Sequence, residues 1–167
     1  MSIMSGKYAI IKAQEDKQNF NMINKDIVFI ENPTEDDHGA IIDGINHYAS
    51  QRGLPNTGGY FFAIYDTNQS IIAAISGFDN FGPAEIGGLW VAEAYRNQGY
   101  GKALVQKAEE WAMKKGCQAM TVFTLKDWPV CSWYQKLGFT IEFERPGHRN
   151  HLTGCYLIKK SINHDKH

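Results

Sequence analysis

The sequence predicts a mixed α/β fold with the element order β-α-β-β-β-α-β-α-β-β. Short segments with strand-like apolar patterns alternate with stretches whose apolar residues recur at helical spacing. A strand–helix–strand unit around residues 84–125 implies a parallel crossover within a mixed sheet. The chain has 167 residues, 43% of them hydrophobic, which suits one compact domain. We assign that domain to residues 26–162 and treat residues 1–25, which lack clear periodicity, as an N-terminal extension of unknown order.

The first two predicted elements are a strand and a helix. Residues 27–30 form an apolar run that Pro33 ends, which favours a short strand. The hydroxyl of Thr34 can then cap the first turn of a helix. Three acidic residues at positions 35–37 suit the positive end of its dipole.

A hairpin and a third strand are predicted next. Residues 60–65 and 70–78 are strand-like, and a polar turn joins them. Residues 84–92 are rich in Ile, Leu, Trp and Val but are interrupted by Gly87 and Gly88. Paired glycines inside a strand indicate a bulge.

The C-terminal half continues the alternation of helices and strands. A long helical pattern begins after Gly101 and ends at Gly116. Turn residues separate the elements that follow. We expect a strand at 118–125, a short helix at 130–137, and two last strands at 139–145 and 152–160.

Composition excludes several classes of function. The 17 basic and 18 acidic residues leave a net charge of −1, which argues against a general nucleic-acid binder. The longest apolar runs are far shorter than the roughly 20 residues of a membrane span. No export signal is evident, so we expect a cytoplasmic protein. The three cysteines lack paired spacing, which argues against a disulfide framework or a zinc site.

The segment at residues 96–102 lies between a strand and a helix, the position of a phosphate-binding loop. Amides near a helix N-terminus converge on an anion, and glycines allow close backbone approach. A Walker A loop would need Ser or Thr at position 103, and a dinucleotide fingerprint would need Gly at 104; the sequence has Ala and Leu. An ordinary glycine loop is the alternative. The candidate binding residues are Arg96, Asn97, Gln98, Gly99, Tyr100, Gly101 and Lys102.

At this segment the sequence resembles the GNAT superfamily of acetyl-CoA-dependent N-acetyltransferases. Arg96, Gly99 and Gly101 match the pyrophosphate loop of that family. A second stretch, residues 132–139, is similar to its F-Y-x-K-x-G-F signature, with Trp133 in place of the commoner Phe. The resemblance covers residues 26–160 and implies a GNAT-like acyl-CoA N-acyltransferase fold with splayed central strands.

The resemblance implies that acetyl-CoA binds as a co-substrate. We expect no metal, because His148 and His151 have no acidic or thiol ligand at regular spacing. In this family, the strand before the loop splays from its neighbour, and its backbone groups bind the pantetheine arm and the thioester carbonyl. The matching residues are Leu89, Trp90 and Val91, with Gly87 and Gly88 as the splay point. The alternative is that these three side chains belong only to the core.

The resemblance also implies two catalytic residues. Tyr134 matches the family's general acid. A phenol suits this role because it stays protonated at neutral pH and can donate its proton to a departing thiolate. Glu85 resembles the general base of the histone-type branch, where Ala-Glu-Ile precedes the splay. A packed aromatic residue is the alternative for Tyr134. A solvent-facing glutamate, with a water relay in its place as base, is the alternative for Glu85.

The predicted function is therefore an N-acetyltransferase that passes the acetyl group to a primary amine. Direct attack through a tetrahedral intermediate needs no covalent enzyme intermediate. The acceptor is a small-molecule or peptide amine that the sequence does not identify. A non-catalytic acyl-CoA-binding module of the same fold is the alternative. The sequence does not decide whether the protein forms a homodimer.

Overall fold

The computed structural model describes residues 27–54, 57–79 and 81–160. The predicted N-terminal extension at residues 1–25 lies outside the described residues. The chain divides into two compact units, residues 1–56 and 57–167, and each is described by itself.

The described part of the first unit contains the helix α2 (Glu35–Ser50). The Thr34 hydroxyl accepts a hydrogen bond from the Asp37 amide, and the Asp37 carboxylate accepts one from the Thr34 amide. These reciprocal bonds are a complete capping box, which satisfies two backbone groups at the helix start. The prediction that Thr34 begins a helix is confirmed.

The strand predicted at residues 27–30 is wrong. These residues pair with no strand. Their side chains are exposed, with Ile27 at 101% and Phe29 at 87%. An apolar, β-branched run forms a strand only when a neighbouring strand satisfies its backbone groups, and a sequence pattern does not say whether that neighbour exists.

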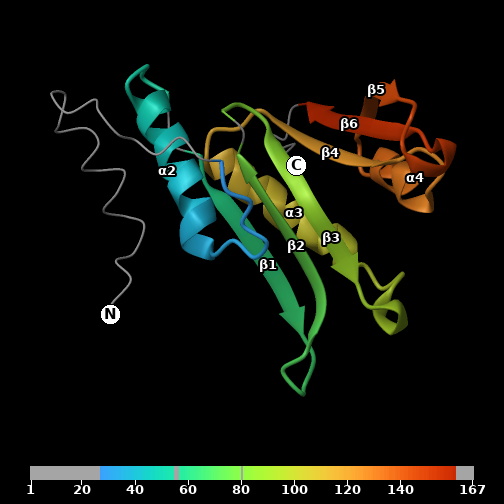
Figure 1. Cartoon of the computed structure of the whole chain (residues 1–167). Helices are drawn as coiled ribbons and strands as arrows, with labels where there is room; N and C mark the ends of the chain where they lie inside the picture. Colours follow the sequence, from blue (N-terminus) through green and yellow to red (C-terminus); the bar gives the residue numbers. More distant parts are fainter. Residues whose placement is uncertain (1–26, 55–56, 80, 161–167) are drawn as a thin grey trace, which may run out of the picture. The chain divides into compact units, whose positions relative to one another are not determined.

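The second unit is built on a six-stranded sheet with the order β1-β2-β3-β4-β6-β5 (Figure 1). β3 and β4 are parallel, and every other neighbouring pair is antiparallel. The strands are β1 (Gly59–Tyr65), β2 (Ile71–Asp79), β3 (Ala84–Val91), β4 (Ala119–Leu125), β5 (Thr140–Arg145) and β6 (Gly154–Lys160). The predicted mixed α/β class and its parallel crossover are confirmed.

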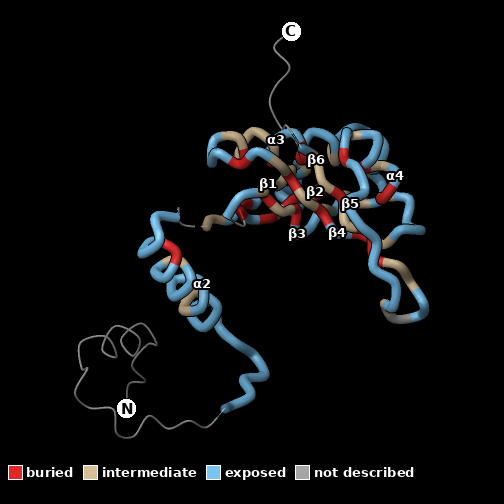
Figure 2. The backbone as a smooth tube through the Cα atoms, turned by 90° about the horizontal axis from the view of Figure 1, so that it is seen from above, coloured by how far each residue is buried: buried red, intermediate tan, exposed pale blue. Residues whose placement is uncertain are grey.

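Two helices pack on this sheet. α3 (Tyr100–Lys114) connects β3 to β4 and contacts β1, β2, β3 and β4, whereas α4 (Pro129–Lys136) contacts β4 and β5. The buried residues of α3 include Leu104, Ala108 and Ala112, which recur at the spacing of one helix face. Figure 2 shows buried stretches along the strands of this unit. Within the described ranges, no helix is both long and apolar enough to cross a membrane.

Local side-chain contacts explain the predicted hairpin. The Asp66 carboxylate accepts hydrogen bonds from the amides of Asn68 and Ser70, at 2.8 and 2.9 Å. Asp side chains favour tight turns because they satisfy amides that would otherwise lack a partner. This turn joins β1 and β2 as an antiparallel pair.

Candidate functional site

Strands β3 and β4 pair over only three residues each. The parallel ladder joins residues 84–86 to residues 120–122 and stops there. β3 nevertheless continues to Val91, and β4 to Leu125. Figure 1 shows the two strands diverging beyond the paired segment. We call this point the parting of β3 and β4.

A bulge in β3 lies directly beyond the last pair. Against β2, Ile86 pairs with Gly77 and Gly88 pairs with Ser76, so Gly87 has no partner in the register. A bulge bends its strand and increases the local twist. The bulge predicted at the paired glycines is confirmed, and it lies where β3 leaves β4.

Beyond the bulge, β3 directs backbone groups toward the edge that β4 has left. The Ala92 amide donates to the Ile72 carbonyl on β2, at 2.8 Å. Backbone groups of successive strand residues point to opposite edges. Leu89 and Val91 therefore direct their amides to the open edge, whereas the Trp90 amide points toward β2. The Trp90 side chain is itself 53% exposed.

Two predicted binding residues brace the loop that follows β3. Arg96 Nε donates to the Val91 carbonyl at 3.1 Å. Gln98 Nε2 donates to the Ala94 carbonyl at 3.0 Å. The first bond joins the loop to the end of β3, and the second joins two residues of the loop. Both side chains therefore stabilise the loop conformation.

The backbone of this loop turns sharply before α3. Asn97 and Gly99 have φ angles of 60° and 87°, in the left-handed region. Tyr100 packs edge-on against Tyr95, with 6.3 Å between ring centroids. The Lys102 side chain is exposed. This turn brings the start of α3 close to the end of β3, where Gly101 lies near Val91.

We call residues 97–102 the cradle. None of its six amides donates a backbone hydrogen bond to the part of the chain that the structure describes; the first helical bond runs from the Ala103 amide to the Gly99 carbonyl. Gly99 is the N-cap and supplies no side-chain acceptor, unlike Thr34 at the start of α2. Unpaired amides at a helix N-terminus carry partial positive charge. The cradle therefore suits an anion such as a phosphate group.

Gly101 lies where the cradle, β3 and α4 meet. A Cβ atom at this position would lie 3.3 Å from Trp133 Cζ2 and 3.7 Å from Val91 Cγ2. Trp133 precedes Tyr134 in α4. The two motifs that the sequence singled out are therefore in contact, although more than 30 residues separate them.

Tyr134 is buried, with 3% of its surface exposed, and its ring packs against Trp133 and Phe139 at 5.0 and 5.3 Å between centroids. Its hydroxyl makes no hydrogen bond to any residue in the described ranges. Among those residues, only His148 Nε2 is a fully enclosed side-chain nitrogen or oxygen without a partner, so the Tyr134 oxygen is not fully enclosed. Burial raises the pKa of Tyr134 to about 12, which keeps the phenol protonated.

Glu85 lies on β3, two residues before the bulge at Gly87. Its neighbours Ala84 and Ile86 are buried in the core, so alternation directs the half-buried Glu85 side chain to the other face of the sheet. Tyr134 belongs to the core on the α3 side. Burial raises the pKa of Tyr60 above its usual range, and Tyr134 and Glu85 both add to the shift. The two predicted catalytic residues thus lie near one tyrosine but face opposite sides of the sheet.

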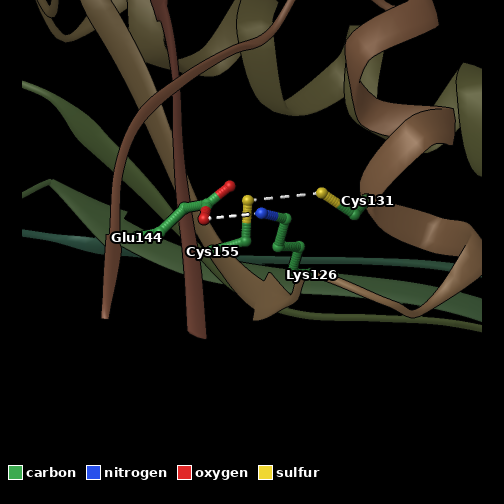
Figure 3. Close-up of polar contacts among 4 residues, drawn as sticks. All are labelled: Lys126, Cys131, Glu144 and Cys155. Atoms are coloured by element: carbon green, nitrogen blue, oxygen red, sulfur yellow. Dashed lines mark hydrogen bonds and ion pairs between the residues drawn. The ribbon is translucent and has the colours of Figure 1, made fainter. Parts of the chain in front are cut away.

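The thiol nearest Tyr134 in the chain is enclosed. Cys131 Sγ on α4 donates to Cys155 Sγ on β6 at 3.3 Å, and both residues are buried (Figure 3). Burial raises the pKa of the Cys155 thiol, so this thiol stays protonated at neutral pH. Beside the pair, Lys126 and Glu144 form an ion pair of 2.8 Å. This arrangement supports packing roles for the two cysteines.

Two contacts of the site have no counterpart in the sequence reasoning. Trp133, which the sequence indicates only as a replacement for the commoner Phe of the family signature, abuts the cradle at Gly101. Tyr60 belongs to no motif in the sequence, yet its hydroxyl donates to the Glu85 carbonyl at 3.1 Å. No local pattern indicates either contact, because each joins separate elements. Across the described residues, no group of three or more His, Cys, Asp or Glu side chains is placed to hold a metal ion.

The sequence matches the model of the acetyltransferase (GNAT) family over residues 25–139. This range is more than half of the chain and contains the parting, the cradle and Tyr134. No curated protein matches the sequence.

Solved structures share the fold. A protein assigned as an acetyltransferase from Agrobacterium tumefaciens has a TM-score of 0.67 and 24% identity, over 81% of this chain and 98% of that one. An acetyltransferase from Bacillus cereus has a TM-score of 0.61 and 22% identity, over 80% and 97%. A protein assigned as a streptothricin acetyltransferase from Bacillus anthracis, solved with acetyl coenzyme A, has a TM-score of 0.57 and 24% identity, over 65% and 66%.

We expect the variant Gly101→Asp to lose acetyl-CoA binding. Its Cβ would press on Trp133 and its carboxylate would place negative charge beside the cradle amides. Acetyl-CoA at about 100 times its Kd should raise the melting temperature of the wild type by about 5 °C or more. Differential scanning fluorimetry should show this shift for the wild type and for the control Gly44→Asp, where a Cβ meets nothing within 4 Å. An equal shift in Gly101→Asp would contradict the cradle as the binding site.

Proposed function

Because this chain belongs to the acetyltransferase (GNAT) family, we propose that it transfers the acetyl group of acetyl-CoA to a primary amine by direct attack. One observation carries the proposal: a cradle of unpaired amides adjoins the parting of β3 and β4. The proposal treats residues 26–162 as one N-acetyltransferase domain, since the family match runs from one unit into the other. Acetyl-CoA supplies the acetyl group as an activated thioester.

The cradle fits the pyrophosphate of acetyl-CoA. The unpaired amides of residues 97–102 can donate to phosphate oxygens, and Lys102 adds a positive charge that forms no ion pair in the described chain. Position 101 admits no side chain without pressing on Trp133. The similar structure from Bacillus anthracis was solved with acetyl coenzyme A, which supports acetyl-CoA as the acetyl donor here.

The open edge of β3 fits the acyl end of the donor. The amides of Leu89 and Val91 point away from β2, so they can donate to a carbonyl oxygen on which negative charge develops. Donors held by a strand need little reorganisation during the reaction, which makes their stabilisation effective.

Tyr134 is proposed as the general acid. Its protonated hydroxyl is not fully enclosed and has no partner in the described chain, so it can give its proton to the departing thiolate. The enclosed Cys131–Cys155 pair supports direct transfer, because an acyl-cysteine route would need an accessible thiolate.

Glu85 is proposed as the base that removes a proton from the acceptor ammonium. Its side chain points to the sheet face opposite α3. The acceptor amine and acetyl-CoA would therefore approach the parting from different faces. This separation lets one residue handle the amine while Tyr134 handles the sulfur. The acceptor is a small-molecule or peptide amine. The alternative to Glu85 is a water relay that ends at a backbone carbonyl or at Asp127.

We expect Tyr134→Phe to keep acetyl-CoA affinity while lowering kcat by about tenfold or more, because only the donated proton is lost. The measurement is thiol release from acetyl-CoA with a panel of primary amines, from pH 6 to 9. With a pKa of about 12, Tyr134 stays protonated throughout this window, so the loss should not vary with pH. The control is Tyr48→Phe, which removes an exposed hydroxyl on α2. An unchanged kcat in Tyr134→Phe would leave Tyr134 as packing, and wild-type binding without turnover of any amine would favour the acyl-CoA-binding module.

We expect Glu85→Gln to lower kcat/KM most at low pH. A primary alkyl ammonium has a pKa near 10.4, so more free amine forms without the enzyme as the pH rises, and the deficit should narrow between about pH 6.5 and pH 9. The control is Glu142→Gln, an exposed glutamate on β5. Parallel pH profiles for the wild type and Glu85→Gln would rule out Glu85 as the base.

A further inference from the structure

The hydroxyl of Tyr60 reaches across one strand of the sheet to the next. Tyr60 lies on β1 and is 7% exposed. Its Oη donates to the Glu85 carbonyl on β3 at 3.1 Å, although β2 separates β1 from β3. An ordinary side chain on the intervening strand would block this path.

Gly77 on β2 opens the path. A Cβ atom there would collide with the Glu85 carbonyl oxygen and would lie 2.5 Å from Tyr60 Oη. The Glu85 oxygen thus occupies the place of a side chain at position 77, which means that it is turned out of the plane of the ladder. Gly77 also marks the register shift, because it pairs with Ile86 immediately before the bulge at Gly87.

A carbonyl turned out of the ladder inside a protein needs another donor. Tyr60 is that donor. Burial, with further contributions from Tyr134 and Glu85, raises the pKa of Tyr60, so its hydroxyl keeps the proton that it donates. Two aromatic contacts anchor the ring: a tilted contact with Trp111 at 4.8 Å and a stacked contact with Phe62 at 5.7 Å between centroids.

The consequence concerns the strand beyond the bulge. The Glu85 peptide adjoins both the register shift with β2 and the last residue pair with β4, beyond which the Leu89 and Val91 amides point to the open edge. We propose that Tyr60 is a positioning residue for acetyl transfer: by holding the Glu85 carbonyl above Gly77, it fixes the bulge that aims the open-edge amides at the acyl end of acetyl-CoA. This inference rests on the proposed function.

The test compares two ligands on Tyr60→Phe, a variant that keeps the ring and removes only the hydroxyl. Acetyl-CoA would contact both the cradle and the open edge of β3. Adenosine 3′-phosphate 5′-diphosphate carries the pyrophosphate but no pantetheine arm, so it would contact the cradle alone. By calorimetry, we expect acetyl-CoA to bind about five to ten times more weakly to Tyr60→Phe, with the affinity for the nucleotide unchanged. kcat should fall as well.

Two further variants separate positioning from stability. Gly77→Ala should reproduce the selective loss, because its methyl group displaces the same carbonyl. Leu157→Val shortens a buried side chain on β6, a strand that does not border β3, and should change neither affinity. Two results would overturn the role of Tyr60 without touching the proposed function. One is an equal affinity of wild type and Tyr60→Phe for acetyl-CoA, and the other is an equal loss of affinity for acetyl-CoA and for the nucleotide. Failure of the wild type to bind acetyl-CoA would overturn the proposed function and this role with it.

Discussion

The early end of the β3–β4 ladder is the constraint on which the site depends. Two parallel strands that separate after three paired residues leave backbone groups without partners, which is costly unless something else satisfies them. At the open edge, Arg96 satisfies the Val91 carbonyl, and on the β2 side of the bulge Tyr60 satisfies the Glu85 carbonyl. The amides of Leu89, Val91 and the cradle receive no such partner, so this region holds a surplus of donors. A surplus of donors is what an oxyanion and a pyrophosphate require.

Close packing joins this backbone site to the helix that carries Tyr134. Trp133 fills the space left by the absent side chain of Gly101, and Val91 closes the same space from β3. The next residue along α4, Tyr134, is thereby held between Trp133 and Phe139 with its hydroxyl not fully enclosed. Burial gives this phenol its raised pKa, and the same burial keeps the Cys131 and Cys155 thiols enclosed. One packed layer thus sets both the position of the proposed acid and its protonation.

Sequence patterns predicted the features that depend on interactions between residues close in the chain. The Thr34 cap, the turn at Asp66, the bulge at Gly87 and the glycine loop before α3 each depend on neighbouring residues, and each is present. The strand expected at residues 27–30 failed because pairing depends on a partner that a single segment does not encode. The Tyr60–Glu85 and Trp133–Gly101 contacts were not predicted for the same reason: they arise only when the sheet has brought distant elements together.

The most direct test of this account is a ¹H–¹⁵N correlation spectrum of the protein titrated with acetyl-CoA. Unpaired amides that receive phosphate or carbonyl oxygens should shift more than any others. The account predicts that the largest changes fall on residues 97–102 and on Leu89 and Val91, while the amides of the β5–β6 pair stay nearly unchanged. Saturable binding whose largest shifts lie outside the cradle and the open edge of β3 would contradict it.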